Sequence, residues 1–485
     1  MILRDKIYIN TAELGYKISN LCELFTYKNP EIFHKKRLKL SIRNVPPYLY
    51  HYKLADTDGK KILQIPRGGL PRVIAFYKQN NLPFRLIDQR VEHLPLDVHL
   101  VDTTLDKQQE RVVSVLLQND GGLIEVSPGG GKTISMLGLI AVLKQPTLII
   151  THELRLSDQW MTEIRQRLGG TYVLGKYDGD VKKDGDIVVG IINSLYNIYQ
   201  EDPTFFNKFG TIIVDETHHL PAEMFLSVLN NMPAKYRIGV TGTVKRKDQK
   251  ELLTFDVLGK ILIKFEAGDL KHRITTFDYR IVNTNIRMEI PTIFRWTGQK
   301  REDVLNMTEL LTKLVENNDR NAIILKEAID LIQTGYFPLI LSDRVQHNEY
   351  LHEQLTALGI KTVLMIGKTR KKTNWDVTRN DSTIQCIVAN SKIASEGLDL
   401  PRLSALILTC PSTNVHKLKQ QIGRIRRVCE GKPLPMVVDI CDNLACTRPA
   451  GDEEPNYLLR HTARTRIRFY EKLKNEYDDV EDTDS

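Results

Sequence analysis

The chain has 485 residues, of which 41% are hydrophobic and 26% are charged, and its formal net charge is +8. A chain of this length exceeds what one hydrophobic core supports, so we expect two or three globular domains. The sequence has no apolar run long enough to cross a bilayer and no signal-peptide core, and its six scattered cysteines exclude a disulfide framework. We therefore expect a soluble intracellular protein without a membrane partner.

The first 95 residues differ in composition from the rest of the chain. They are rich in Tyr and Lys, contain short strand-like pieces, and carry the turn signal PRGGLP at 66–71. These features predict a small N-terminal accessory domain, 1–95, whose fold does not follow from the sequence. A basic cluster at 35–39 is read either as a solvated face or as a contact with a polyanion.

Residues 96–285 are expected to form an α/β domain. Short β-rich runs alternate there with helical stretches, which is typical of a doubly wound parallel sheet. The expected strands are 121–127, 147–151, 187–192, 211–215 and 237–241.

A glycine-rich string, VSPGGGKT at 126–133, lies between the first expected strand and an apolar helix expected at 132–144. Glycine lets backbone N–H groups approach phosphate oxygens, because a Cβ atom would block them. The string predicts a phosphate-binding loop in which Lys132 reaches the β- and γ-phosphates and the Thr133 hydroxyl ligates Mg²⁺. Its expected nucleotide contacts are Ser127, Pro128, Gly129, Gly130, Gly131, Lys132 and Thr133. A plain Gly-rich turn is the alternative.

A second string, DETH at 215–218, follows the buried run TIIV at 211–214. Open α/β sheets place their chemistry at the carboxyl ends of the strands. We therefore expect Asp215 to hold Mg²⁺ and Glu216 to orient and deprotonate the attacking water. Two acids at a strand end can instead cap a helix, but the preceding loop favours an ATPase site.

Residues 286–475 repeat the α/β pattern. The expected strands are 337–342, 361–366, 384–389, 403–409 and 435–440. The polar stretch at about 266–320 is interpreted as a connection between the two domains with some helix. Residues 476–485 are acidic and poor in apolar side chains, and we expect a disordered tail.

The second domain also carries arginines that suit a triphosphate. In QQIGRIRR at 420–427, Arg424 and Arg427 are three residues apart, which predicts one face of a helix. We expect them to stabilise charge on the γ-phosphate at an ATP site between the two domains. A basic surface helix is the alternative. Upstream, SKIASEGLDLP at 391–401 places Gly397 and Asp399 in a loop suited to the ribose end of the nucleotide.

Taken in order, these strings resemble the motifs of superfamily 2 helicases of the DExH type. Further matches are LDKQQ at 105–109, TLIITHELRLSDQW at 147–160, VGIINSL at 189–195, TGT at 241–243 and LILSDRVQHNEYL at 339–351. Within the superfamily the chain resembles the XPB-like branch and helicases of phage and large DNA viruses, including those of poxviruses, iridoviruses and asfarviruses. Two departures are Gly242 in place of the usual Ala and Val244 in place of a common Pro.

The resemblance implies an α/β fold, with two tandem RecA-like doubly wound parallel-sheet domains and a small N-terminal accessory domain. It also implies roles for individual residues. Catalysis falls to Lys132, Glu216, Arg424 and Arg427, and adenine recognition to Gln109. Coupling of ATP state to movement falls to His218, Thr241, Thr243 and Gln420. Nucleic-acid contact falls to Ser194, Arg344 and Ser395, with Arg67 and the 35–39 cluster as further candidates.

The function expected from this resemblance is an ATP-dependent DNA helicase or translocase that uses ATP and Mg²⁺. Nucleic acid is the expected partner, DNA rather than RNA, together with transcription or replication proteins; the oligomeric state stays open. A viral role in transcription termination, replication or repair would place the protein in the host cytoplasm, nucleus or virion. The alternatives are a duplex translocase or RNA helicase without DNA strand separation, and a nucleic-acid-binding module with a degenerate ATPase.

Overall fold

The computed structural model divides the chain into two compact units, each described here by itself. The first unit holds Met1–Val126 and Gly131–Lys264, and the second holds Ser127–Gly130 and Phe265–Ser485. The structure describes the chain except for residues 38–40, 58, 220–221, 244–249, 267, 287, 289–290, 298–299, 367–380, 392–399, 443–444, 448–452, 456 and 479–485.

The larger sheet of the first unit has eight strands in the order β13-β12-β14-β10-β15-β16-β9-β17. From β12 to β9 every neighbouring pair is parallel, as the continuous apolar runs predicted. The strands are β9 (Gly121–Val126), β10 (Thr147–Thr151), β12 (Leu174–Asp178), β13 (Val181–Lys183), β14 (Ile187–Ile191), β15 (Thr211–Asp215), β16 (Tyr236–Thr241) and β17 (Ile261–Phe265).

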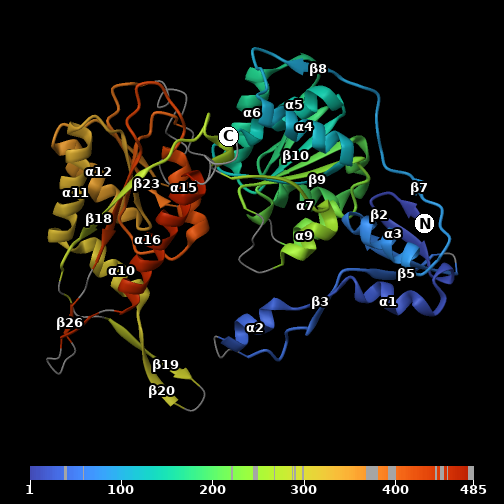
Figure 1. The fold of residues 1–485 in the computed structure, drawn as a ribbon, viewed down its shortest axis with the longest axis horizontal. Coiled ribbons are helices and arrows are strands. Elements are labelled where there is room, and N and C mark those ends of the chain that lie inside the picture. The colour runs from blue at the N-terminus through green and yellow to red at the C-terminus, as the bar shows by residue number, and fades with distance from the viewer. Residues whose placement is uncertain are drawn as a thin grey trace. The chain divides into compact units, whose positions relative to one another are not determined.

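Helices cover both faces of this sheet (Figure 1). One face carries α4 (Lys107–Asn119), α5 (Lys132–Leu143) and α6 (Leu154–Arg167). The other carries α7 (Ile192–Glu201), α8 (Ala222–Leu229) and α9 (Glu251–Leu258), which pack on a buried apolar core. A two-stranded pair, β8 (Asp97–Leu100) with β11 (Leu168–Thr171), lies beside them.

The accessory residues of the first unit form a five-stranded sheet in the order β5-β6-β2-β1-β7. Its core joins β1, β2 and β6 to α1 and α3 through Leu3, Ile7, Leu21, Ile65 and Val73. The elements are β1 (Ile2–Leu3), β2 (Lys6–Asn10), α1 (Ile18–Glu23), β3 (Thr26–Lys28), α2 (Pro30–Arg37), β4 (Tyr48–Tyr50), β5 (Lys53–Thr57), β6 (Lys60–Pro66), η3 (Arg67–Gly69), α3 (Leu70–Gln79) and β7 (Ile87–Asp88).

The PRGGLP turn joins this small sheet to the larger one. Gly68 lies against the end of α9, where an added Cβ would collide with the backbone of Phe255, Asp256 and Gly259. Asp256 is buried and accepts hydrogen bonds from Tyr27 at 2.9 Å and His51 at 2.6 Å, and it also pairs with Arg72. The turn therefore requires glycine because two backbones touch there.

The second unit is built on a six-stranded parallel sheet in the order β18-β25-β24-β21-β23-β22. Apolar side chains of α15 and α16 pack on one face, and those of α11 and α12 on the other. The strands are β18 (Asp278–Asn283), β21 (Pro338–Ser342), β22 (Thr362–Met365), β23 (Cys386–Asn390), β24 (Ala405–Leu408) and β25 (Met436–Cys441). The helices are α10 (Met307–Glu316), α11 (Asn318–Gln333), α12 (Val345–Ala357), α15 (Val415–Ile425) and α16 (Tyr457–Asp478).

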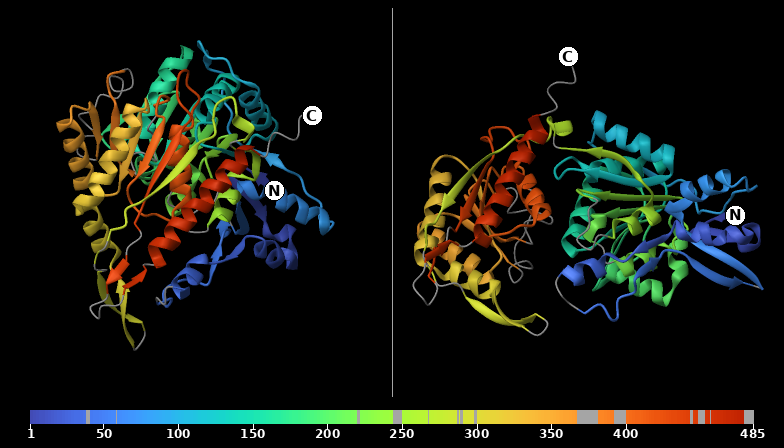
Figure 2. Two further views of the ribbon diagram at one scale, coloured as in Figure 1. Left: turned by 60° about the vertical axis from the view of Figure 1, so that its left-hand side comes forward. Right: turned by 60° about the horizontal axis from the view of Figure 1, so that its bottom comes forward.

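The stretch 266–320 is more than a connection. It supplies β18, which pairs with β25 along six residues, although 278–283 precede the domain boundary expected at 286. It also contains a hairpin of β19 (Thr292–Thr297) and β20 (Lys300–Leu305), which extends from the second unit (Figures 1 and 2). The sequence DYRIVN of β18 is polar and therefore did not predict a strand. A polar strand is possible here because β18 lies at the edge of the sheet, where its side chains need not be fully buried. At the other end of the chain, α16 continues to Asp478, and the rest of the expected acidic tail lies outside the described residues.

The two units thus share one architecture. Each is an α/β domain with a mainly or wholly parallel sheet and helices on both faces, which is the doubly wound RecA-like arrangement. The predicted fold class is confirmed.

Candidate active site

The glycine-rich loop leads from β9 to α5, as the pattern predicts. Gly129 and Gly131 have φ angles of +87° and +81°, which side chains with a Cβ rarely adopt. Gly131 is the N-cap of α5, and Lys132 and Thr133 form its first turn. The loop therefore ends at a helix N-terminus, where backbone N–H groups and the helix dipole favour a phosphate.

Lys132 meets Glu216 at the carboxyl edge of the sheet. The Lys132 Nζ forms an ion pair with Glu216 Oε1, and the two side chains are only 15% and 17% exposed. Glu216 has a φ of +47°, an unfavourable backbone conformation for a residue with a Cβ. Backbone strain of this kind persists where the surrounding residues hold a side chain in place. The neighbours of Glu216 therefore fix the orientation of its carboxylate.

A hydrogen-bond network connects Glu216 with the TGT string. The Gly242 N–H donates to Glu216 Oε2 at 3.2 Å, and the Thr241 hydroxyl lies 3.3 Å from the same oxygen. His218 Nδ1 is 2.7 Å from the Thr241 hydroxyl and 3.4 Å from Glu216 Oε2. The Thr241 hydroxyl also donates to the Thr243 carbonyl at 2.6 Å. Four of the predicted residues are thus brought together, and Gly242 contributes through its backbone, which any residue could supply.

The two acids of DETH have opposite electrostatic surroundings. Burial, followed by the charge of Glu216, raises the pKa of Asp215. Burial also acts to raise the pKa of Glu216, but the charges of Lys132 and His218 outweigh it, and the pKa lies below its ordinary value. Adjacent carboxyls in one site are thereby separated in proton affinity, as catalytic pairs commonly are.

Trp160 was not predicted as a partner of this site. Its Nε1 donates to Asp215 Oδ2 at 2.9 Å, and both side chains are buried. The signal was present in the string closing at Gln159-Trp160, but sequence does not show that α6 brings this ring to the end of β15.

Gln109 has a structural role that was not predicted from the sequence. It forms a capping box with Asp106 at the start of α4, with hydrogen bonds of 2.9 and 3.0 Å. The side chain is buried, and its Nε2 has no hydrogen-bond partner among the residues that the structure describes. A buried unpaired amide donor beside the phosphate-loop helix suits an acceptor on a ligand.

In the second unit, the helix of QQIGRIRR ends earlier than predicted. The helix α15 stops at Ile425, so Gln420 and Arg424 lie on it and Arg427 does not. Arg427 instead forms an isolated bridge with Ile274, because Thr275 donates to the Arg426 carbonyl at 2.8 Å and Val428 to the Arg273 carbonyl at 2.9 Å. These backbone bonds replace the next helical turn. The one-face prediction for Arg424 and Arg427 is therefore wrong, although both remain half-buried.

The remaining expected contacts lie on different elements of the two units. Ser194 lies on α7 and accepts from the Gly179 N–H at 2.9 Å. Arg344 is the N-cap of α12 and donates to the Thr308 carbonyl at 2.9 Å. Ser395, Gly397 and Asp399 fall outside the described residues, as do residues 38 and 39 of the 35–39 cluster.

Arg67 does not fit an external nucleic-acid contact. It is buried and donates to the carbonyls of Ala234 at 2.5 Å and Lys235 at 3.0 Å. Its position in the PRGGLP turn places it inside the joint between the two sheets of the first unit, which sequence alone could not indicate.

Two features are absent from the described part of the chain. None of its helices combines the length and apolarity needed to cross a membrane. It also holds no group of three or more His, Cys, Asp or Glu side chains placed to enclose a metal ion.

Two protein families match successive parts of the chain. The family described as type III restriction enzyme, res subunit, matches residues 99–246, and the helicase conserved C-terminal domain matches residues 307–429. The first match contains the phosphate loop, DETH and TGT, and the second contains QQIGRIRR. The chain belongs to the superfamily 2 helicases.

Relatives of this helicase include proteins of viruses and archaea. A protein named as a helicase from Escherichia phage T5 is 28% identical over 81% of this chain and 82% of its own length. One named as an ATP-dependent RNA helicase from Acanthamoeba polyphaga mimivirus is 26% identical over 90% and 82%. A protein named DNA 3′-5′ translocase, of the XPB type, from Sulfurisphaera tokodaii is 25% identical over 72% and 81%. The helicase thus belongs with viral and XPB-like members.

Among solved structures, the fold matches that of an ATP-dependent type ISP restriction-modification enzyme bound to DNA. The TM-score is 0.53 at 15% identity, and the match covers 78% of this helicase and 30% of that chain. The likeness supports the fold. The family assignment makes this chain an ATP-hydrolysing enzyme that binds nucleic acid.

Proposed function

We propose that this helicase is a DNA motor that couples Mg-ATP hydrolysis to movement along a strand. The observation that carries the proposal is the network at the carboxyl edge of the first sheet, which joins Lys132, Glu216, Thr241 and His218. It connects a phosphate-binding lysine to groups that can pass on the state of the nucleotide. The archaeal relative, named a DNA translocase, favours DNA as the track.

In the proposed cycle, Lys132 leaves Glu216 for the β- and γ-phosphates. The loop 127–131 supplies backbone N–H groups to the same phosphates. Removal of the neighbouring positive charge raises the proton affinity of Glu216. Glu216 then becomes a better base for the attacking water at the moment when the triphosphate is bound. Gln109 would read the adenine through its unpaired amide donor.

The donor set fits Mg²⁺. Asp215 offers a buried carboxylate held by Trp160, and Thr133 offers a hydroxyl at the start of α5. Mg²⁺ is usually bound by one or two protein groups together with phosphates and water, which agrees with the small number of protein ligands here. When bound, the ion neutralises charge on the phosphates.

Coupling is proposed to run through the Thr241 hydroxyl, which contacts Glu216, His218 and the Thr243 backbone. A change at Glu216 would shift these hydrogen bonds and so reach the loop that follows β16. In the second unit, we assign stabilisation of γ-phosphate charge to Arg424 and Arg427, with Gln420 as a further sensor on α15 and Gly397 and Asp399 near the ribose.

Contact with the strand is assigned to Ser194, Arg344 and Ser395. Contacts of this type are to phosphate and sugar, which carry no base information, as a motor moving along any sequence requires. Viral transcription termination, replication or repair is the proposed setting, since two of the relatives are viral.

The test compares phosphate release with single-stranded DNA, duplex DNA, forked DNA and RNA at equal nucleotide concentration. The proposal expects DNA to stimulate turnover more than RNA. Stronger stimulation by RNA would instead support RNA helicase activity, which the name of the mimivirus relative favours.

A second candidate is translocation on duplex without strand separation, which the name of the archaeal relative favours. Displacement of a triplex-forming strand, measured beside unwinding of a forked duplex, separates the two activities. Triplex displacement without unwinding identifies a duplex translocase. Unwinding of the fork identifies a helicase.

A further inference from the structure

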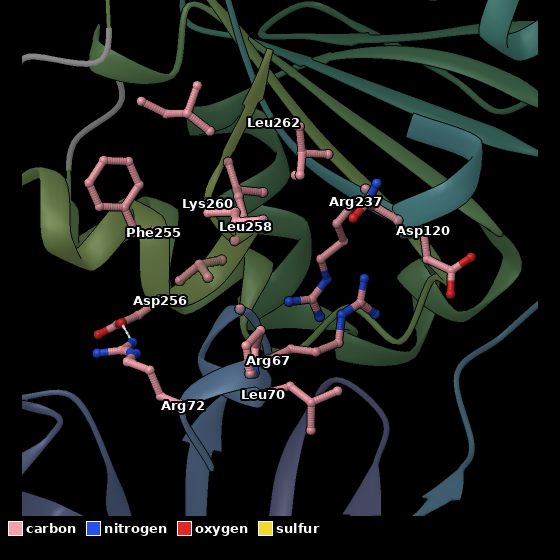
Figure 3. Close-up of a pocket in the computed structure, with 18 of the residues that line it drawn as sticks. Arg67, Leu70, Arg72, Asp120, Arg237, Phe255, Asp256, Leu258, Lys260 and Leu262 are labelled. Carbon is pink, nitrogen blue, oxygen red and sulfur yellow. Dashed lines mark hydrogen bonds and ion pairs between the residues drawn. The ribbon is translucent and has the colours of Figure 1, made fainter. Parts of the chain in front are cut away.

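A cavity of about 570 Å³ lies within the first unit, between the accessory sheet and the larger sheet. Arg67 and Leu70 line it from η3 and α3, and Arg237, Phe255 and Leu262 line it from β16, α9 and β17 (Figure 3). Its volume is in the range of small-molecule sites, roughly 300–1,000 Å³.

Two buried guanidinium groups meet at this cavity. Arg237 is 1% exposed, and its Nη2 donates to the Asp5 carbonyl at 2.8 Å and to the Met232 carbonyl. Its Nε and Nη1 are buried and have no hydrogen-bond partner among the described residues. Among the described residues, Arg67 donates only to the backbone carbonyls named above and to that of Arg4 at 3.5 Å. Within the described ranges no carboxylate pairs with either arginine.

Burial and neighbouring positive charge lower the pKa of both groups. Burial, followed by the charges of Arg237 and Arg90, lowers the pKa of Arg67, and burial lowers the pKa of Arg237 to about 10. Asp5 acts on Arg237, and Asp88 and Asp120 act on Arg67, only through space. Buried like charges without a directly bonded carboxylate are costly, and an anion placed between them would lower that cost.

The carboxylates in the cavity wall are already engaged elsewhere. Asp120 accepts from Arg90 at 2.9 Å, and Asp256 is held by Tyr27, His51 and Arg72. The rest of the wall is largely apolar, with Leu70, Phe255, Leu258 and Leu262. The cavity therefore combines two guanidinium groups, to which no described carboxylate is bonded, with an apolar surface.

We propose that this cavity binds a small organic anion, with a phosphate or carboxylate group attached to an apolar body. The free N–H groups of Arg237 donate to the oxyanion, and Arg67 adds its charge. The apolar body packs against Phe255 and the leucines. Because the ligand touches η3 on one side and α9 and β16 on the other, it stabilises the joint between the accessory sheet and the ATPase sheet.

The test uses phenyl phosphate as the probe and the full-length protein, with saturating ADP and Mg²⁺ to fill the nucleotide site. Isothermal titration should give one saturable site. Inorganic phosphate should bind at least about tenfold more weakly and benzyl alcohol should not bind, because charge and apolar body are both required. Absence of a saturable site, or equal binding of phosphate alone, would overturn the proposal.

Two variants locate the site. Leu252→Glu places an acid at the cavity wall on an α9 position that is 49% exposed, and it should weaken binding at least about tenfold. The matched control, Leu358→Glu, adds the same charge at a position 61% exposed in the second unit and should bind like the wild type. Arg237→Met should abolish binding, and if that variant does not fold, the Leu252 pair carries the test alone.

Unchanged binding in Leu252→Glu places the probe elsewhere and contradicts the proposal. A single-stranded oligonucleotide that displaces phenyl phosphate would also contradict it, since the cavity would then belong to a nucleic-acid path.

Discussion

The two units carry polar clusters that differ in burial and in purpose. In the first, Lys132 and Glu216 form an ion pair whose side chains keep 15% and 17% exposure, and Glu216 has a strained φ of +47°. In the second, Arg320 and Asp442 pair at 2.8 Å with side-chain exposures of 0% and 1%. Arg320 also donates to the Thr409 carbonyl, and Asp442 accepts from Thr284 at 2.9 Å. A pair that exchanges partners with a ligand needs access, whereas a pair that only holds a fold can be sealed.

The largest expected effect is the loss of turnover in Lys132→Ala. We expect at least about a 10³-fold fall in nucleic-acid-stimulated phosphate release. The reason is that we assign to this lysine the positive charge that stabilises the transferred phosphoryl group. The midpoint of thermal unfolding should change little, since both side chains of the pair keep some contact with solvent, at 15% and 17% exposure. Lys107→Ala, at the exposed start of α4, is the control. Retained turnover in Lys132→Ala would contradict the assignment.

Arg320→Met, in contrast to Lys132→Ala, should strongly lower the free energy of unfolding. Removing one partner of a buried pair leaves Asp442 uncompensated, which costs about 3–5 kcal/mol of unfolding free energy. Arg280→Met, which removes a 50% exposed partner of Glu327, should cost less than about 1 kcal/mol. Urea unfolding measures both, and equal losses in the two variants would remove the contrast between sealed and accessible pairs.

Trp160→Phe tests whether the polar cluster around Lys132 and Glu216 includes a group that orients the proposed metal ligand Asp215. The change removes the Nε1 donor that orients Asp215 but keeps an aromatic ring in place. We expect the Mg²⁺ concentration for half-maximal ATPase activity to rise about 10–100-fold, as for other outer-sphere partners of metal ligands. An unchanged Mg²⁺ dependence would show that Asp215 does not need this hydrogen bond.

The smallest expected effect is the pH dependence of stability that His347 contributes beside the Arg320–Asp442 pair. His347 bonds to Ser342 and Asn321 at 2.9 Å each, and burial, followed by the charge of Arg320, lowers its pKa to about 3. The unfolded imidazole titrates near about 6.5, so between these values only the unfolded chain takes up the proton. Stability should therefore fall as the pH decreases below about 6.5, by up to about 1.4 kcal/mol per pH unit.

His347→Gln removes this contribution and should flatten the profile of unfolding free energy between pH 7 and pH 5. A residual slope is expected from His51, whose pKa burial and then Arg72 lower to about 4. A profile as steep as that of the wild type would rule out His347 as a source of the pH dependence.

The same contrast explains how much could be predicted from sequence. The ten strands named beforehand are present because buried parallel strands are continuous apolar runs, while the polar edge strand β18 gave no such signal. Lys132, Thr133, Asp215 and Glu216 could be proposed as site residues because phosphate chemistry requires those residue types at fixed local spacing.

Contacts between distant residues were not identifiable. Trp160 and Asp215 are 55 residues apart, and Arg320 and Asp442 are 122 apart, so only the folded sheets bring them together. The end of α15 before Arg427 likewise depends on pairing with residues 273–275, which no helical pattern encodes.

Glu216→Gln tests the central claim most directly, because the variant keeps the shape of the side chain and removes its capacity to accept a proton. The measurement is ATP binding and DNA-stimulated phosphate release on one preparation. The account predicts ATP affinity within about threefold of the wild type and turnover reduced at least about 10²-fold. Turnover near that of the wild type, or an equal loss of affinity and turnover, would contradict a catalytic role for Glu216.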